Sequence, residues 1–106
     1  MGNQSGQIIV ITGSTKRFGT EIYALAESMR RKGEFVIDDS QFHLLPEHIG
    51  RREFIKRICD ADRLLVYNKN GYIGFHTRLE ITLARVIGVD VEFLFPRGEM
   101  TEEFTE

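Results

Sequence analysis

The chain has 106 residues, of which 42% are hydrophobic and 28% are charged. This composition fits one soluble globular domain and excludes a disordered or collagen-like chain. Fourteen basic and 16 acidic side chains leave a net charge of −2, which argues against bulk nucleic-acid binding because that needs a basic excess. No apolar stretch is long enough to span a bilayer, residues 1–7 hold no signal-peptide core, and the single cysteine cannot form an internal disulfide. We therefore expect a cytoplasmic protein without membrane contact.

Short apolar runs alternate with longer amphipathic segments along the chain. The apolar runs predict four strands, at 7–12, 34–37, 63–68 and 89–95. Helical spacing of apolar residues predicts three helices between them, at 16–32, 46–60 and 77–87.

Strands that alternate with helices predict a parallel sheet covered by helices on both faces. We expect a small three-layer α/β domain of the flavodoxin-like or Rossmann-like kind over residues 1–96, with strand order 2-1-3-4, followed by an acidic tail at 97–106. Ligands bind such sheets at the carboxyl ends of the strands. The loops after the first and third strands are therefore the predicted site.

The helical spacing also predicts which side chains turn inward. In the second and third helices these are Ile49, Ile55, Ile58 and Cys59, and Leu79, Leu83, Ala84 and Ile87. Arg51 and Arg52 are expected on an outer helix face.

The loop after the first strand combines glycine, hydroxyl and basic residues. Gly13 allows a sharp turn, and the hydroxyls of Ser14 and Thr15 precede Lys16 and Arg17 at the start of a helix. Such a loop can hold a phosphate on the free amides of the helix start. It can equally be a strand-to-helix turn with a hydroxyl cap, since it matches neither a P-loop nor G-x-G-x-x-G.

The segment after the third strand holds the candidate nucleophile. Thr77-x-x-Glu80 has the spacing of a capping box, and this structural role is the one that the spacing favours. A carboxylate kept ionised at a strand's carboxyl end is also what attack on a sugar carbon needs, and the two roles can coexist. The candidate binding residues of this segment are Asn68, Gly71, Tyr72, Gly74, His76 and Thr77.

Other polar residues carry weaker signals. Asp38 and Asp39 follow the second strand, where an acidic residue can bind ribose hydroxyls, although adjacent aspartates in a loop are usually solvated. The three histidines and Cys59 show no metal-ligand spacing, so we expect neither a metal nor another cofactor.

Residues 61–84 resemble the nucleoside 2-deoxyribosyltransferase-like family, which includes deoxynucleoside monophosphate N-glycosidases. The matching features are Ala61-Asp62 before a strand, Gly71-Tyr72-Ile73-Gly74, Thr77 to Ile81 with Ala84, and the opening Ile11-Thr12-Gly13-Ser14. The resemblance implies a flavodoxin-like sheet and cleavage of the N-glycosidic bonds of deoxynucleosides or their 5′-phosphates. It assigns the nucleophile to Glu80 and phosphate binding to Ser14 and its neighbours.

The leading interpretation is therefore an N-glycoside hydrolase or transferase that acts on a nucleoside or nucleotide. A non-catalytic nucleotide-binding module of the same fold is the alternative, and an interaction domain in which Glu80 is only a cap is a third. A short edge strand and a small core also predict a homodimer in which a helix pair covers apolar surface.

Overall fold

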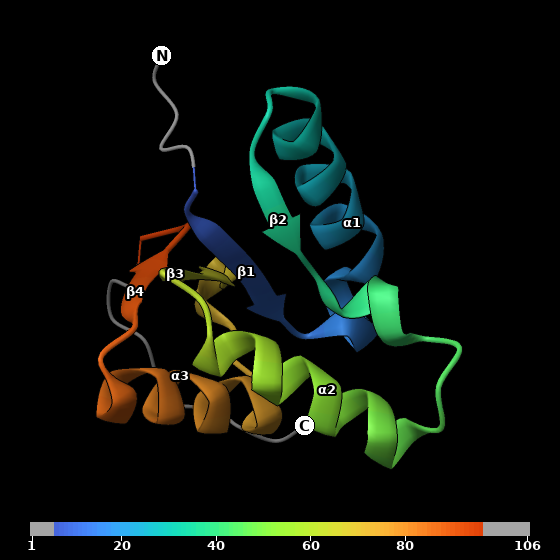
Figure 1. Cartoon of the computed structure of the whole chain (residues 1–106), viewed down its shortest axis with the longest axis vertical. Helices are drawn as coiled ribbons and strands as arrows, with labels where there is room; N and C mark the ends of the chain where they lie inside the picture. Colours follow the sequence, from blue (N-terminus) through green and yellow to red (C-terminus); the bar gives the residue numbers. More distant parts are fainter. Residues whose placement is uncertain (1–5, 97–106) are drawn as a thin grey trace.

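The computed structural model describes residues 6–96, so the predicted acidic tail at 97–106 lies outside the described residues. Strands and helices alternate along the chain (Figure 1). The strands are β1 (Ile8–Gly13), β2 (Phe35–Ile37), β3 (Arg63–Tyr67) and β4 (Asp90–Phe93). The helices are α1 (Thr15–Arg31), α2 (Glu47–Cys59) and α3 (Phe75–Ile87), with short 3-10 turns η1 (Asp39–Phe42) and η2 (Lys69–Gly71).

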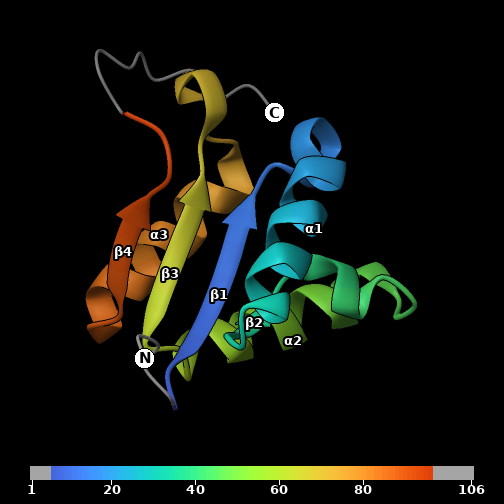
Figure 2. The same ribbon diagram turned by 90° about the horizontal axis from the view of Figure 1, so that it is seen from above.

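The four strands form one parallel sheet in the order β2-β1-β3-β4, which confirms the predicted fold and strand order. Figure 2 shows the arrows of β1, β3 and β4 side by side and pointing the same way. In the register of the two central strands, Val10 lies opposite Leu64 and Gly13 opposite Tyr67. The carboxyl ends of β1 and β3 therefore meet at one edge, where the predicted site was placed.

Helices cover both faces of the sheet (Figure 1). One core lies between the sheet and α2 and α3, and Val10, Phe54 and Ala84 belong to it. The other lies beneath α1, where Ile9 and Ile11 pack with Ile22 and Ala26. Successive residues of a strand point to opposite faces, so an uninterrupted apolar run is what a strand buried on both sides needs.

The inward faces of α2 and α3 differ from the predicted ones. In α2 the buried residues are Gly50, Phe54 and Ile58, while Ile49 and Ile55 are half-buried and Cys59 is exposed. The prediction of a core cysteine was wrong because the buried residues follow one another at intervals of four, and Cys59 lies off the helix face that they share.

In α3 the buried residues are Thr77, Glu80, Ile81 and Ala84. The exposed positions include Leu79 and Ile87, which were predicted to face inward. Apolar residues occur on both sides of this helix, so periodicity alone could not identify the side that faces the sheet. Within residues 6–96, no helix has the length and apolar character needed to cross a membrane.

Candidate functional site

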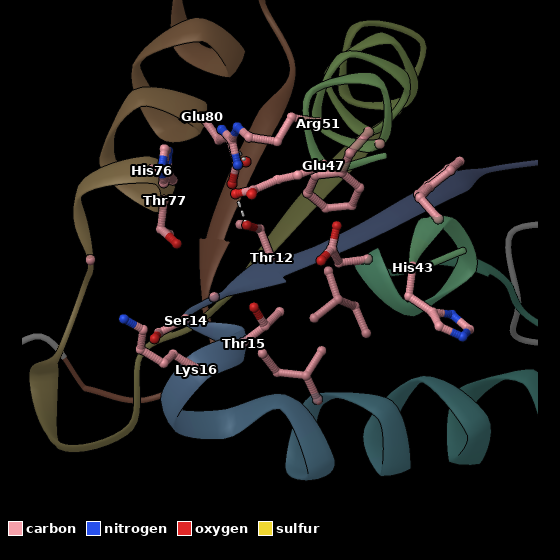
Figure 3. Close-up of a pocket in the computed structure, with 18 of the residues that line it drawn as sticks. Thr12, Ser14, Thr15, Lys16, His43, Glu47, Arg51, His76, Thr77 and Glu80 are labelled. Carbon is pink, nitrogen blue, oxygen red and sulfur yellow. Dashed lines mark hydrogen bonds and ion pairs between the residues drawn. The ribbon is translucent and has the colours of Figure 1, made fainter. Parts of the chain in front are cut away.

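A cavity of about 540 Å³ opens at the carboxyl edge of the sheet. Its lining comes from the end of β1, the starts of α1, α2 and α3, and η1. Figure 3 shows Glu80, Arg51 and Thr12 on one side, and Ser14, Thr15 and Lys16 at the start of α1 on another. Ligands bind this edge in open α/β sheets.

Glu80 is the buried acid of the cavity, with 4% of its surface exposed. The hydroxyl of Thr12, from β1, donates a hydrogen bond to Oε1 of Glu80 (Figure 3). Nη2 of Arg51, from α2, lies 3.4 Å from Oε2. Three separate elements therefore hold this carboxyl group at the cavity wall.

The predicted capping box of Thr77 and Glu80 is wrong. Helix α3 begins at Phe75, with Gly74 as an N-cap that offers no side-chain hydrogen bond. Thr77 and Glu80 therefore lie inside the helix, on the buried side that also carries Ala84. Positions three and four residues apart share one helix face, so the spacing that suggested a cap instead places Thr77 and Glu80 together at the cavity.

Burial is the main influence on the Glu80 carboxyl, and it raises the pKa of that group. The hydrogen bond from Thr12 and the positive charge of Arg51 oppose this rise because they favour the ionised form. The negative charge of Asp39 adds to it. A carboxyl group whose pKa is shifted by burial and by specific charged neighbours is a feature common at functional sites.

The start of α1 combines a hydroxyl cap, backbone amides and basic residues at the cavity. The Arg17 amide donates to the Ser14 side chain over 3.3 Å, so Ser14 is the helix cap. Thr15 and Lys16 are the first residues of the helix and line the cavity, and the backbone amides of a first turn have no partner within the helix. The first turn of α1 has no acidic residue and holds two basic ones, the reverse of what a helix start prefers unless an anion is bound.

Gly13 has a packing role at this edge. A Cβ atom built on it would lie 2.9 Å from the carbonyl oxygen of Tyr67 in β3 and 3.0 Å from the side chain of Ile22 in α1. The lack of a side chain therefore lets β1, β3 and α1 meet closely beneath the cavity floor.

The cavity brings together eight of the predicted site residues. These are Gly13, Ser14, Thr15, Lys16, Gly74, His76, Thr77 and Glu80.

Four other predicted residues, Arg17, Asn68, Gly71 and Tyr72, are not part of the cavity lining. Asn68 is fully buried and uses its amide group to hold the backbone of Phe95, at 2.9 and 3.1 Å. The Arg17 guanidinium stacks on the ring of Tyr72, 3.8 Å from its centre. The structure therefore gives Asn68, Arg17 and Tyr72 contacts with the protein itself.

Four polar residues of the cavity lining, Thr12, His43, Glu47 and Arg51, were missed or misplaced by sequence reasoning. Thr12 was treated as a strand residue, and His43 and Glu47 were given no site role. Asp39 was expected at this edge of the sheet, and it lines the cavity. Arg51, expected on an outer helix face, instead reaches Glu80. The available signal was topological, because α2 and α3 cover the same face of the sheet and their starts lie near one edge.

Within residues 6–96, no group of three or more His, Cys, Asp or Glu side chains is arranged to hold a metal ion. Comparison with protein-family models, curated proteins and solved structures found no match to this chain.

Proposed function

We propose that this protein cleaves or transfers the N-glycosidic bond of a (deoxy)nucleoside or its 5′-monophosphate, with Glu80 as the nucleophile. The observation that carries the proposal is the position of Glu80, a buried acid held by Thr12 and Arg51 in the wall of the cavity. The residues between 61 and 84 that resemble the nucleoside 2-deoxyribosyltransferase-like family support it, and we propose that the chain belongs to that family.

The two carboxylate oxygens of Glu80 have different surroundings. Oε1 accepts the hydrogen bond from Thr12, whereas Oε2 has only the longer contact with Arg51. Oε2 is therefore the oxygen that attacks the anomeric carbon of the sugar. The carbon–nitrogen bond breaks, its electron pair goes to the base, and a glycosyl ester forms on Glu80. Water or an acceptor base then attacks the same carbon and releases Glu80, so the two displacements retain the configuration.

The start of α1 suits the other end of a nucleotide. The free amides of Thr15 and Lys16 and the ammonium group of Lys16 offer hydrogen bonds and positive charge to a 5′-phosphate. A cavity of about 540 Å³ is within the range usual for small-molecule sites.

A non-catalytic nucleotide-binding module is the second candidate. The burial that raises the pKa of Glu80 favours it, because burial disfavours the ionised form that a nucleophile needs. This candidate uses the same cavity and the same anion site, and differs only in turnover.

Release of free base from a panel of nucleosides and nucleoside monophosphates tests the proposal. The wild-type protein should release base, and Glu80→Gln should lower the rate by several orders of magnitude while nucleotide binding persists. Glu53→Gln is the matched control, since Glu53 forms ion pairs on α2 with Lys56 and Arg57 and does not line the cavity. Binding without turnover by the wild type would favour the second candidate.

We also propose that the protein is a homodimer that pairs through α3. Its outward side carries Phe75, Leu79, Val86 and Ile87, which are 43–77% exposed. Phe75 also lines the cavity, so a second copy on this helix would contribute to the cavity mouth. A contiguous apolar patch on a small soluble domain marks an interaction surface.

A further inference from the structure

Glycoside cleavage needs a proton for the departing base as well as a nucleophile. A nucleobase that leaves with the electron pair of the broken bond is a poor leaving group unless an acid protonates it. Glycosidases divide these tasks between two carboxyl groups whose surroundings differ. The proposed reaction therefore calls for a second acid that reaches the cavity.

Besides Glu80, two acids line the cavity, Glu47 in the first turn of α2 and Asp39 in η1. Glu47 is exposed, whereas Asp39 is half-buried, so Asp39 is the acid that η1 holds in the cavity wall. It directly follows Asp38, which is 2% exposed and caps η1. Nη2 of Arg30 lies 2.9 Å from the Asp38 carboxylate and 3.0 Å from the side chain of Gln41, and also donates to the carbonyl of Val36. This network fixes η1 at the end of β2. The Asp38 carboxylate is engaged by Arg30 within this network, whereas the neighbouring Asp39 lines the cavity.

The Asp39 carboxyl is open to a ligand. No hydrogen bond to it is found within residues 6–96, in contrast to Glu80, which is held by Thr12 and Arg51. No side-chain polar atom in that range is both fully buried and unpaired, so Asp39 is reached from the cavity rather than sealed inside the protein. Asp39 lies near enough to Glu80 and Arg51 for their charges to interact.

We propose that Asp39 is the general acid that protonates the leaving nucleobase while Glu80 attacks the sugar, an inference that rests on the proposed function. The proton moves from the Asp39 carboxyl to a ring nitrogen of the base as the carbon–nitrogen bond breaks. In the second step the Asp39 carboxylate takes a proton from the attacking water as the ester on Glu80 is cleaved. Both groups then return to their starting states.

The electrostatics of the two acids agree with this division. Burial is the main cause that raises the pKa of Asp39, and the adjacent Asp38 adds to the rise while Arg51 opposes it. Among the described residues no hydrogen-bond donor favours the ionised form of Asp39, whereas Thr12 and Arg51 both favour the ionised form of Glu80. Asp39 thus has surroundings that suit a proton donor, while Glu80 has two neighbours that support its ionised form.

Two substrates with different leaving groups separate acid catalysis from other roles. A natural nucleoside monophosphate needs a proton on its base, whereas the 4-nitrophenyl glycoside of the same sugar phosphate releases a phenolate that needs none. Asp39→Asn should lower kcat on the nucleotide by about 10²–10⁴-fold and change kcat on the 4-nitrophenyl glycoside by less than about tenfold. The second substrate also shows that the variant is folded and holds the sugar. Asp60→Asn, an exposed acid at the end of α2, is the control and should match the wild type on both.

Equal losses on the two substrates would overturn the proposal and assign Asp39 to binding the sugar hydroxyls. Unchanged rates on both would also overturn it. Glu80→Gln is tested alongside and should lose both activities. If it retained both, the proposed role of Glu80 would fail while the leaving-group comparison still decided the role of Asp39. A wild type inactive on both substrates would overturn the proposed function and this inference together.

Discussion

The pKa of Glu80 reflects a balance between burial and two neighbouring side chains. Removal from water disfavours its charge, and this is the largest influence on its pKa. Thr12 and Arg51 restore part of the lost stabilisation through one hydrogen bond and one ionic contact. Arg51 remains 32% exposed, so its charge is partly screened by solvent. Burial therefore wins, and the folded protein holds the Glu80 proton more tightly than the unfolded chain does.

This raised pKa predicts how stability depends on pH. Because the pKa of Glu80 is higher in the folded protein than in the unfolded chain, protonation of Glu80 stabilises the fold. This stabilisation is complete at pH values below 4.5, the ordinary glutamate pKa, and it is lost as the pH rises through the pKa of the folded state. Glu80→Gln stays neutral throughout. Its melting temperature should therefore equal or exceed that of the wild type at about pH 7, and this advantage should shrink toward about pH 4.

Thermal unfolding of both proteins across this range measures the effect. Glu53→Gln is the control, because it removes a partly exposed carboxylate of α2. The difference in melting temperature between this variant and the wild type should change much less with pH. An advantage of Glu80→Gln that stayed constant or grew on acidification would contradict the account of a carboxyl group disfavoured by burial.

At this scale the sequence predicted part of the site. Ser14, Thr15, Lys16, Thr77 and Glu80 could be found because hydroxyl, basic and acidic residues after strands are visible in a linear pattern. The meeting of Thr12 and Arg51 at Glu80 could not be predicted, because it depends on the axial rotation of α2, which local spacing does not encode. Asp39 was expected at this edge of the sheet, but its place near Arg51 and Glu80 depends on the path of η1.

Among the elements, α3 lines the cavity with one side and presents exposed apolar residues on the other. Thr77 and Glu80 on its inner side reach the cavity, while Leu79 on its outer side is 51% exposed. A helix with apolar residues on both sides is normally covered on both sides. Its start at Phe75 rather than Thr77 shows why boundaries are hard to predict, since Gly74 begins the helix without a side-chain cap.

Pairing through α3 predicts a concentration-dependent dimer. Light scattering of the wild type should give about twice the chain mass of 12.2 kDa, and Leu79→Glu should give the single-chain mass because it places a charge in the apolar contact. Tyr23→Glu is the matched control, since Tyr23 on α1 is also about half exposed, at 49%, but lies on the other side of the sheet. A wild type that stays at the single-chain mass at high concentration, or a dimer that survives Leu79→Glu, would contradict this assembly.

Across the whole molecule, the order of strands could be predicted because strong apolar runs alternate with amphipathic segments. Parallel pairing and right-handed crossovers then leave few arrangements. The sheet face beneath α1 is covered by that helix alone among the described residues, and toward β4 it becomes polar, with Arg63 and Glu92 paired at 2.9 Å. The charged pair suits strands that face solvent there. The sheet thus brings the end of β1, the η1 turn after β2 and the starts of α2 and α3 to one cavity, although the residues that line it are far apart in sequence.

The most direct test of the central claim is capture of the glycosyl ester on Glu80. A 2-fluoro-substituted nucleotide slows breakdown of such an ester, because fluorine disfavours positive charge at the neighbouring anomeric carbon. Mass spectrometry of the treated protein should show one added fluorinated glycosyl group, mapped to the peptide that contains Glu80 and absent from Glu80→Gln. Base release accompanied by an adduct on another residue, or base release by Glu80→Gln at the wild-type rate, would contradict Glu80 as the nucleophile.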